Sequence, residues 1–206
     1  MSVEKERAYW GGLADADGPL RAAWGDPASD GIDHCLGMVM PAIAGGLGPG
    51  GRVLDLGCGG GRLAIPIARC APAAHLFGVD SAPAMIGAAS RDAQDAEIYN
   101  VSWLVNDGRM IPALGPIDAA YSVLVFQHLP GPVVRAYIDQ VLGMLAPGGT
   151  FRFQWVTGND EHPGEYSYDH RAETLLGGHA LGVDALGVDP VFDEWRWATL
   201  TKPTAG

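Results

Sequence analysis

The sequence is poor in basic residues, and its lysines are only Lys5 and Lys202. Thirteen lysines and arginines stand against 24 aspartates and glutamates, which gives a formal net charge of −11. Proteins that bind nucleic acid or an anionic membrane surface depend on clustered basic side chains. The composition therefore predicts neither a nucleic-acid partner nor a membrane partner.

Cysteines and long apolar runs are also scarce. Cys35, Cys58 and Cys70 show no CxxC spacing, so we predict neither a zinc site nor a disulfide framework and expect a cytoplasmic location. No run approaches the roughly 18 apolar residues of a membrane-spanning helix. The first seven residues are charged where a signal peptide would be apolar, which disfavours secretion.

The remaining composition is that of a globular chain of 206 residues with 48% hydrophobic content, a length typical of one domain. From residue 52 onwards, short apolar runs alternate with segments of helical periodicity. We predict strands over 53–56, 75–79, 98–105, 117–125 and 150–156. We predict helices over 62–69 and 132–145, and a third helix that starts near Ser81 as N-cap. This alternation is typical of an α/β fold: a doubly wound, mainly parallel sheet with helices on both faces.

The two ends of the chain are predicted to serve different purposes. Residues 1–50, with amphipathic stretches near 4–13 and 34–43, are expected to form an N-terminal helical arm or lid. Residues 51–206 are expected to form the ligand-binding domain. Within it, 157–190 is a candidate substrate-specificity segment, 171–181 a possible helix and 194–200 a possible closing strand.

A glycine-rich turn, DLGCGGGR at 55–62, follows the first predicted strand. It does not fit the dinucleotide fingerprint GxGxxG, whose last glycine is replaced by Arg62, and it lacks the lysine of a phosphate-binding P-loop. A tight turn whose glycines serve packing alone remains an alternative. Glycines at this place in an α/β sheet also allow a ligand to approach the backbone closely.

Acidic residues lie at the ends of three successive predicted strands: Asp55, Asp80 and Asp107. The carboxyl ends of parallel strands meet at one edge of the sheet, where open α/β sheets bind their ligands. Asp80 follows the loop by about 20 residues, the distance at which an acid would hold a ribose diol. Asp118 opens the next strand, so we expect it at the opposite edge in a structural role.

The loop, together with VDSAPAMI at 79–86, FQHLP at 126–130 and LAPGG at 145–149, resembles class I S-adenosylmethionine-dependent methyltransferases over about half of the chain. The resemblance implies a Rossmann-like methyltransferase fold and S-adenosyl-L-methionine as cofactor. It implies that the methionine moiety contacts Asp55, Gly57 and Gly59, that the ribose hydroxyls donate to Asp80, and that the adenine lies against Ser81, Met85, Asp107 and Gly108. Two of these residues have plainer alternatives, because Asp55 could cap a helix and Met85 could be ordinary core.

The acceptor side carries fewer signals. Enzymes of this fold that methylate amino groups of nucleic acids resemble one another in an Asn/Asp-Pro-Pro-Tyr/Phe motif. Residues 122–126, SVLVF, lack this motif, and its absence favours a small-molecule acceptor. The aspartate of metal-assisted catechol enzymes is also missing there, and we expect no metal. Asp160, Glu161 and His162 are interpreted as a solvated loop.

His128 is the candidate general base, because an imidazole titrates near neutral pH. The alternative is that it packs against the cofactor or caps the following helix. Candidate substrate residues are Gln127, which could contact either ligand, the N-terminal pair Tyr9 and Trp10, and Tyr166 and Tyr168 in the specificity segment.

The sequence therefore predicts an S-adenosylmethionine-dependent methyltransferase that methylates oxygen or nitrogen of a small molecule, as a monomer or homodimer. Two alternatives stay open: a non-catalytic S-adenosylmethionine-binding regulator and an NAD(P)-dependent oxidoreductase. Fold resemblance supplies much of this interpretation, and one fold can host several chemistries.

Overall fold

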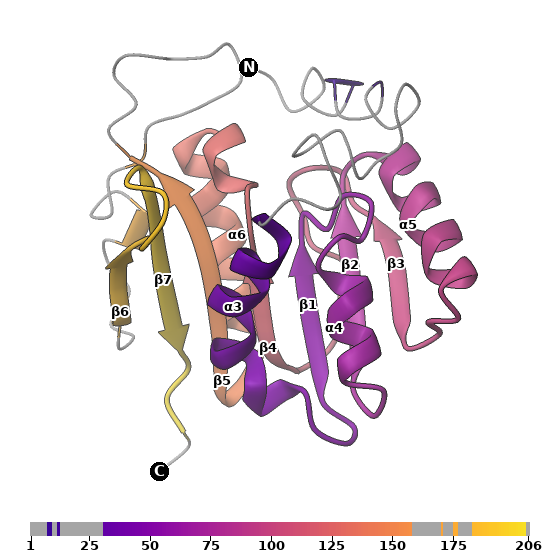
Figure 1. Ribbon diagram of the computed structural model, residues 1–206. Coiled ribbons are helices and arrows are strands. Elements are labelled where there is room, and N and C mark those ends of the chain that lie inside the picture. Colours follow the sequence, from indigo (N-terminus) through magenta and orange to yellow (C-terminus); the bar gives the residue numbers. More distant parts are fainter. Residues whose placement is uncertain are drawn as a thin grey trace.

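The computed structural model describes residues 31–157 and 183–204, together with residues 8, 9, 12, 170, 175 and 176; for 183–186 only the backbone is described. These residues build a seven-stranded sheet in the order β3-β2-β1-β4-β5-β7-β6 (Figure 1). The strands are β1 (Arg52–Leu56), β2 (His75–Asp80), β3 (Val101–Val105), β4 (Ile117–Ser122), β5 (Leu145–Val156), β6 (Val183–Val188) and β7 (Trp195–Thr201). The pairs among β1 to β5 are parallel, and β7 runs antiparallel to both β5 and β6.

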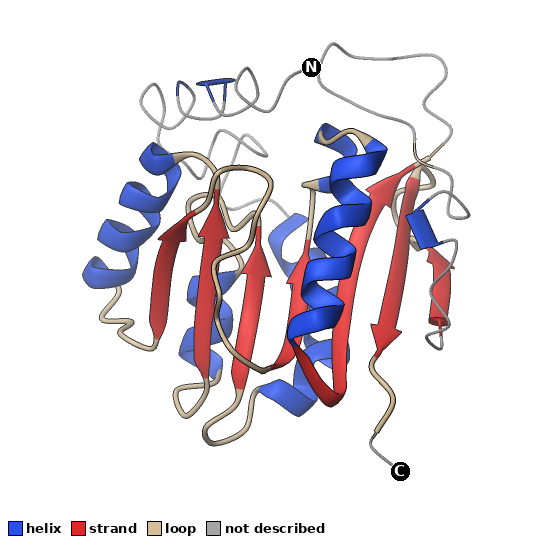
Figure 2. Ribbon diagram, turned by 180° about the vertical axis from the view of Figure 1, so that it is seen from behind, coloured by secondary structure: helices blue, strands red, loops and turns tan. Residues whose placement is uncertain are grey.

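Helices cover both faces of the sheet. The α-helices are α3 (Gly31–Ile43), α4 (Ala64–Cys70), α5 (Pro83–Asp95) and α6 (Gly131–Met144), and short 3₁₀ turns are η1 (Ala44–Gly46) and η2 (Phe126–His128). Helices α3 and α4 lie in front of the sheet in Figure 1, whereas α6 lies on the opposite face, which is turned towards the reader in Figure 2. Helix α5 packs beside β2 and β3.

The core has two parts because side chains alternate between the faces of each strand. On the α6 side, Leu54 of β1 belongs to the same buried cluster as Ile138 and Val141. On the other side, Val53 belongs to a cluster with Val39 of α3 and Ile67 of α4. The doubly wound architecture predicted from the sequence is confirmed.

Several local predictions need correction. Strand β5 begins at Leu145, so the predicted helix ends one residue earlier than expected. Strand β6 was not predicted. The N-cap of α5 is Ala82 rather than Ser81, and no side chain caps the helix. The Asp80 carboxylate accepts the backbone N–H of Ala82 itself, at 2.8 Å.

The predicted arm is part of the core from α3 onwards. Cys35, Val39 and Ile43 are almost completely buried against the sheet. Most of residues 1–30 lie outside the described part of the chain, so a lid there stays a prediction. At the opposite edge from the strand ends, Asp118 accepts the backbone N–H of Arg52 at 2.9 Å, the structural role that we expected. Among the described helices, none is long and apolar enough to cross a membrane.

Candidate active site

A cleft lies at the carboxyl ends of the strands, where the strand order reverses between β1 and β4. Such a reversal leaves a crevice because the connections on its two sides lead to opposite faces of the sheet. Its wall consists of three groups: residues 55–60 with Arg62 and Leu63; residues 79–81 with Met85, Asn106 and Gly108; and Cys35, residues 123–125, His128, Leu129 and Tyr137.

The glycine loop is fastened to the end of β2. The N–H groups of Gly57 and Cys58 both donate to the carbonyl of Val79, at 2.7 and 3.1 Å. Gly57 and Gly59 have φ values of +78° and +51°, in the left-handed region that favours glycine. A Cβ on Gly57 would come within 2.2 Å of Val125 Cγ2. Glycine at this position therefore permits both the turn and the close packing of the segment that follows β4.

Asp80 ends β2 and joins the loop to α5. Its Oδ2 accepts the Gly59 N–H at 2.9 Å and its Oδ1 accepts the Ala82 N–H at 2.8 Å. Burial raises the pKa of this carboxyl, although the hydrogen bonds from backbone amides act in the opposite direction. Asp80 is thus held in one orientation on the cleft wall.

Asp55 is the more deeply buried acid, with 3% of its surface exposed. Burial raises its pKa to about 8; the neighbouring Tyr121 hydroxyl lowers the pKa, and the charge of Asp80 raises it further. Most Asp55 carboxyls are therefore protonated at neutral pH. A cation entering the cleft would favour the ionised form.

A buried amide forms the end of the cleft nearest β3. Asn106 Nδ2 donates to the Tyr137 hydroxyl at 3.0 Å, and Asn106 Oδ1 accepts the Gly108 N–H at 3.2 Å. This pair links the turn after β3 to α6, which lies on the far face of the sheet. All three residues line the cleft.

The segment after β4 forms a mostly apolar wall with one titratable group. Residues 123–125 are valine, leucine and valine, and Leu124 has a φ of +61°, which is rare for a branched residue. His128 follows on η2 and is half-buried at the cleft. The apolar residues and the imidazole therefore line the same cleft as the loop and its acids.

Helix α3 contributes Cys35, and the end of the glycine loop contributes Arg62. Burial raises the pKa of the Cys35 thiol to about 11, so the thiol is neutral and weakly nucleophilic. Burial lowers the pKa of Arg62, but an arginine remains charged at physiological pH.

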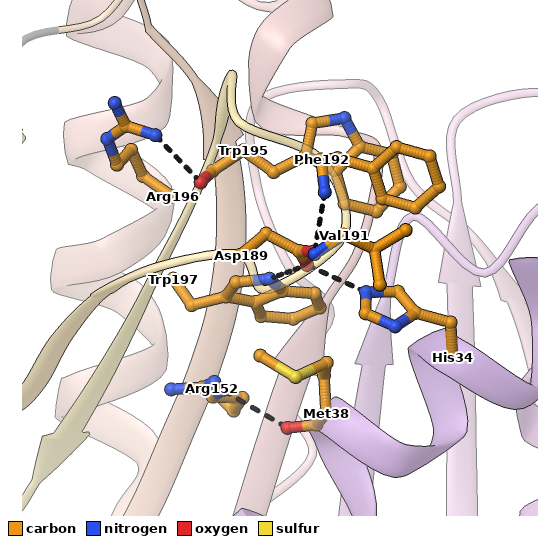
Figure 3. Close-up of polar contacts among 9 residues, drawn as sticks. All are labelled: His34, Met38, Arg152, Asp189, Val191, Phe192, Trp195, Arg196 and Trp197. Atoms are coloured by element: carbon orange, nitrogen blue, oxygen red, sulfur yellow. Dashed lines mark hydrogen bonds and ion pairs between the residues drawn. The ribbon is translucent and has the colours of Figure 1, made fainter.

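Helix α3 is anchored by the residue next to Cys35. His34 Nε2 donates to Asp189 Oδ2 at 2.8 Å, and the Trp197 indole N–H donates to the same oxygen at 2.7 Å (Figure 3). Burial opposes ionisation of Asp189, but these hydrogen bonds, with two from backbone amides, lower its pKa. The contact fixes the cleft side of α3 to the turn before β7.

Comparison with known proteins is consistent with this geometry. Residues 53–149 match the model of a methyltransferase domain family. Trans-aconitate 2-methyltransferase of Streptomyces avermitilis is 36% identical over 115 residues, which cover 54% of this chain and 41% of that protein. A ubiquinone biosynthesis O-methyltransferase of Xylella fastidiosa is 35% identical over 103 residues, or 48% of this chain and 39% of that protein. Nearly half of the chain therefore resembles a methyltransferase domain, and these similarities support a class I S-adenosylmethionine-dependent methyltransferase.

The matched region spans about two fifths of each of these relatives. A solved magnesium protoporphyrin IX methyltransferase from Synechocystis, with bound S-adenosylmethionine, has a TM-score of 0.73 at 20% identity, covering 97% of this chain and 96% of that one. At this identity the likeness concerns the fold, and it confirms the Rossmann-like methyltransferase architecture. The family resemblance predicted from the sequence motifs is likewise confirmed.

The cleft fits S-adenosylmethionine, which is bound in the solved Synechocystis structure. The buried Asp55 carboxyl is suited to a ligand that carries an ammonium and a sulfonium cation. The left-handed glycines let such a ligand approach the backbone. Most residues predicted to bind the cofactor line the cleft together, namely Asp55, Gly57, Gly59, Asp80, Ser81, Met85 and Gly108. Their individual contacts with the cofactor stay predictions.

Asp107 is the member of that set that the cleft wall does not include. Its Oδ1 accepts the backbone N–H groups of Arg109 and Met110, at 2.9 and 2.7 Å, and its side chain is exposed. These two hydrogen bonds lower the pKa of its carboxyl. The flanking residues Asn106 and Gly108 do line the cleft, so Asp107 lies at its rim, and its predicted adenine contact stays a prediction.

The predicted acceptor-side residues are divided among several places. His128 lines the cleft, whereas Gln127 is buried and outside the described cleft wall. Tyr9 is 39% exposed and is also outside that wall. Trp10, Tyr166 and Tyr168 lie outside the described residues, as do Asp160, Glu161 and His162. Within the described residues, no cluster of three or more His, Cys, Asp or Glu side chains could hold a metal.

Sequence reasoning missed several cleft residues: Cys35, Arg62, Asn106 and Tyr137. Arg62 and Asn106 each adjoin a predicted motif, so their position in the sequence was a usable signal. Cys35 and Tyr137 fall on the apolar stripes of helices, where nothing in the pattern distinguishes a cleft residue from a core residue.

Proposed function

We propose that the protein transfers a methyl group from S-adenosylmethionine to a small-molecule acceptor, with an oxygen atom as the first acceptor to test. The names of the two curated relatives, one a trans-aconitate methyltransferase and the other an O-methyltransferase of ubiquinone biosynthesis, support this class. The net charge of −11 disfavours polyanionic acceptors such as nucleic acids.

The observation that carries the proposal is the arrangement of the cleft. The buried Asp55 and the half-buried Asp80 line one cleft with the glycine loop, and the same cleft is lined by His128 and the apolar residues 123–125. An acceptor beside this segment would contact the apolar residues 123–125, with His128 as the titratable side chain of the segment. That environment excludes water from the reacting atoms.

Bound S-adenosylmethionine supplies an activated methyl group and a neutral thioether leaving group. The protein then has to align the acceptor with the methyl carbon and, for a hydroxyl, accept its proton. The acceptor lone pair would take up the methyl carbon, and the electron pair of the carbon–sulfur bond would stay on sulfur. In this proposal His128 takes the proton of the acceptor, and Asp55 and Asp80 hold the cofactor.

The test is methyl transfer from S-adenosylmethionine labelled in its methyl group. Three small acceptor classes are compared: aliphatic polycarboxylates, phenols or catechols, and primary amines, with transfer RNA and duplex DNA as counter-tests. We expect labelled product with an oxygen acceptor and none with nucleic acid. Calorimetric binding of the cofactor without turnover on any class would instead indicate the regulatory alternative, and labelled nucleic acid would contradict the small-molecule assignment.

A further inference from the structure

The segment after β4 makes hydrogen bonds with two buried side chains that belong to neither the loop nor the acids. This segment, Leu124 to Leu129, carries the apolar wall of the cleft and His128. We infer that His170 and Gln154 are positioning residues, which hold this segment, and His128 with it, in place at the cleft. The inference rests on the proposed function only in assigning His128 to the reaction.

His170 contacts both ends of η2. Its Nε2 lies 2.9 Å from the carbonyl oxygen of Phe126 and 3.0 Å from that of Leu129. Because carbonyl oxygens only accept, Nε2 carries a proton and donates to both. The two carbonyls bracket the turn that contains His128, so one imidazole fixes the ends of that turn.

The imidazole is itself held in place. His170 is 4% exposed. Its own carbonyl accepts the indole N–H of Trp155 at 3.1 Å, and its backbone N–H donates to Val156 at 3.4 Å. A Cβ on Gly131, the first residue of α6, would come within 3.9 Å of the ring. The end of β5 therefore anchors His170, and His170 joins it to η2.

Gln154 of β5 holds the other end of the segment. Its Oε1 accepts the Leu124 N–H at 2.9 Å, and the side chain is fully buried. Leu124 has a positive φ, a strained conformation that a non-glycine residue keeps only where its surroundings impose it. Among the described residues, the Gln154 amide nitrogen has no hydrogen-bond partner, a cost that a residue serving packing alone would avoid.

The segment combines a positive φ at Leu124 with a 3₁₀ turn. The two contacts explain how such a segment can hold His128 in a fixed position. They come from β5 and from the residue that follows it in the described chain, not from the loop or α5. Removing them should therefore loosen residues 124–129 while leaving the glycine loop and Asp80 in place. A purely structural role would weaken the whole domain instead.

The experiment compares His170→Leu, which removes the donor, with His170→Gln, whose amide nitrogen can take the place of Nε2. Gln154→Met removes the acceptor for Leu124 at similar volume. His75→Leu is the matched control, because His75 contacts Ser102 at 2.9 Å at the opposite end of the strands. Each full-length variant is examined by hydrogen exchange, by calorimetry with S-adenosylmethionine and by turnover on an acceptor that the parent methylates.

For His170→Leu and Gln154→Met we expect exchange of amides 124–129 to accelerate about ten-fold, the order of effect of losing one or two hydrogen bonds. Turnover should fall, cofactor affinity should stay unchanged, and His170→Gln should restore both exchange and turnover. Faster exchange across the whole domain, or parental exchange in 124–129, would overturn the inference. If exchange responds as expected but the parent methylates nothing, the proposed function fails and the positioning role stands.

Discussion

The carboxylate of Asp189 accepts a hydrogen bond from His34 at 2.8 Å, although 155 residues separate the two in the sequence. Asp189 thereby joins helix α3, whose Cys35 lines the cleft, to the turn that precedes β7. The same carboxylate accepts the Trp197 indole N–H and the backbone N–H groups of Val191 and Phe192. All of its hydrogen bonds favour the ionised form, so Asp189 stabilises the fold as an anion.

Replacing Asp189 by Asn should destabilise the protein at neutral pH by about 1.5–3 kcal/mol, the range for hydrogen bonds to charged groups. The folded-state pKa of Asp189 is lowered, so its contribution is complete above the unfolded pKa of about 3.9 and is lost as pH falls through the folded pKa. Thermal unfolding at several pH values should show the gap between parent and variant closing in acid. The exposed Asp193→Asn is the control, and a constant gap would contradict the assignment.

Asp80→Asn should weaken S-adenosylmethionine binding by about 1.5–3 kcal/mol, because a charge-assisted acceptor for the ribose hydroxyls is lost. Gly59 and Ala82 donate to different oxygens of Asp80, so the single amide oxygen of asparagine can keep only one of these two hydrogen bonds, and the loop should survive in part. Calorimetry of the variant gives the answer. Asp95→Asn, an exposed acid at the end of α5, should bind like the parent, and unchanged affinity in Asp80→Asn would remove Asp80 from the site.

The sequence was informative where one local signal decided the structure. The alternation of apolar runs and helices predicted β1 to β5, and the glycine loop with Asp55 and Asp80 predicted the walls of the cleft. It was uninformative where long-range packing decided. The hydroxyl of Tyr137 at the cleft meets Asn106, which is 31 residues away in the sequence, and Gln154 reaches Leu124 across 30 residues. Such contacts follow from the assembled fold, not from periodicity.

Binding of S-adenosylmethionine should release a proton from Asp55. The pKa of this carboxyl is about 8 in the free protein, and a nearby cation lowers it. Between the free and bound pKa values the acid ionises on binding, so affinity should rise as pH approaches 8 and then level off. At pH 7, calorimetry in buffers of different ionisation enthalpy should show proton release that Asp55→Asn abolishes. Equal binding heats in all buffers would contradict this coupling.

The same acid should lower the stability of the free protein. Its folded pKa lies above the unfolded value, so stability is lost as pH rises from about 4 towards 8. In the absence of cofactor, Asp55→Asn should therefore unfold at a higher temperature than the parent near pH 8 and show a smaller dependence on pH. A variant that melts below the parent at this pH would refute the assignment of Asp55 as a strained acid.

Gly57→Ala should be far more damaging than Gly59→Ala. Both positions have positive φ, which costs a non-glycine residue roughly 1–2 kcal/mol. Only at Gly57 would the new Cβ also lie 2.2 Å from Val125, whereas at Gly59 it would meet nothing within 4 Å. Urea unfolding should rank the two variants in that order, and equal stabilities would show that the segment after β4 moves aside freely.

His128→Ala should lower turnover by ~10²–10⁴-fold if the imidazole accepts the proton of the acceptor. Cofactor affinity should be retained, because the acids and the loop form a different part of the wall. In the parent, turnover should fall in acid as the base becomes protonated, and this acid limb of the turnover–pH profile should vanish in the variant. An acceptor that is already ionised at the assay pH needs no base, so the variant's deficit should shrink with acceptors of lower pKa. A uniform deficit across such a series, or turnover at the parental rate, would leave His128 as a packing residue of η2.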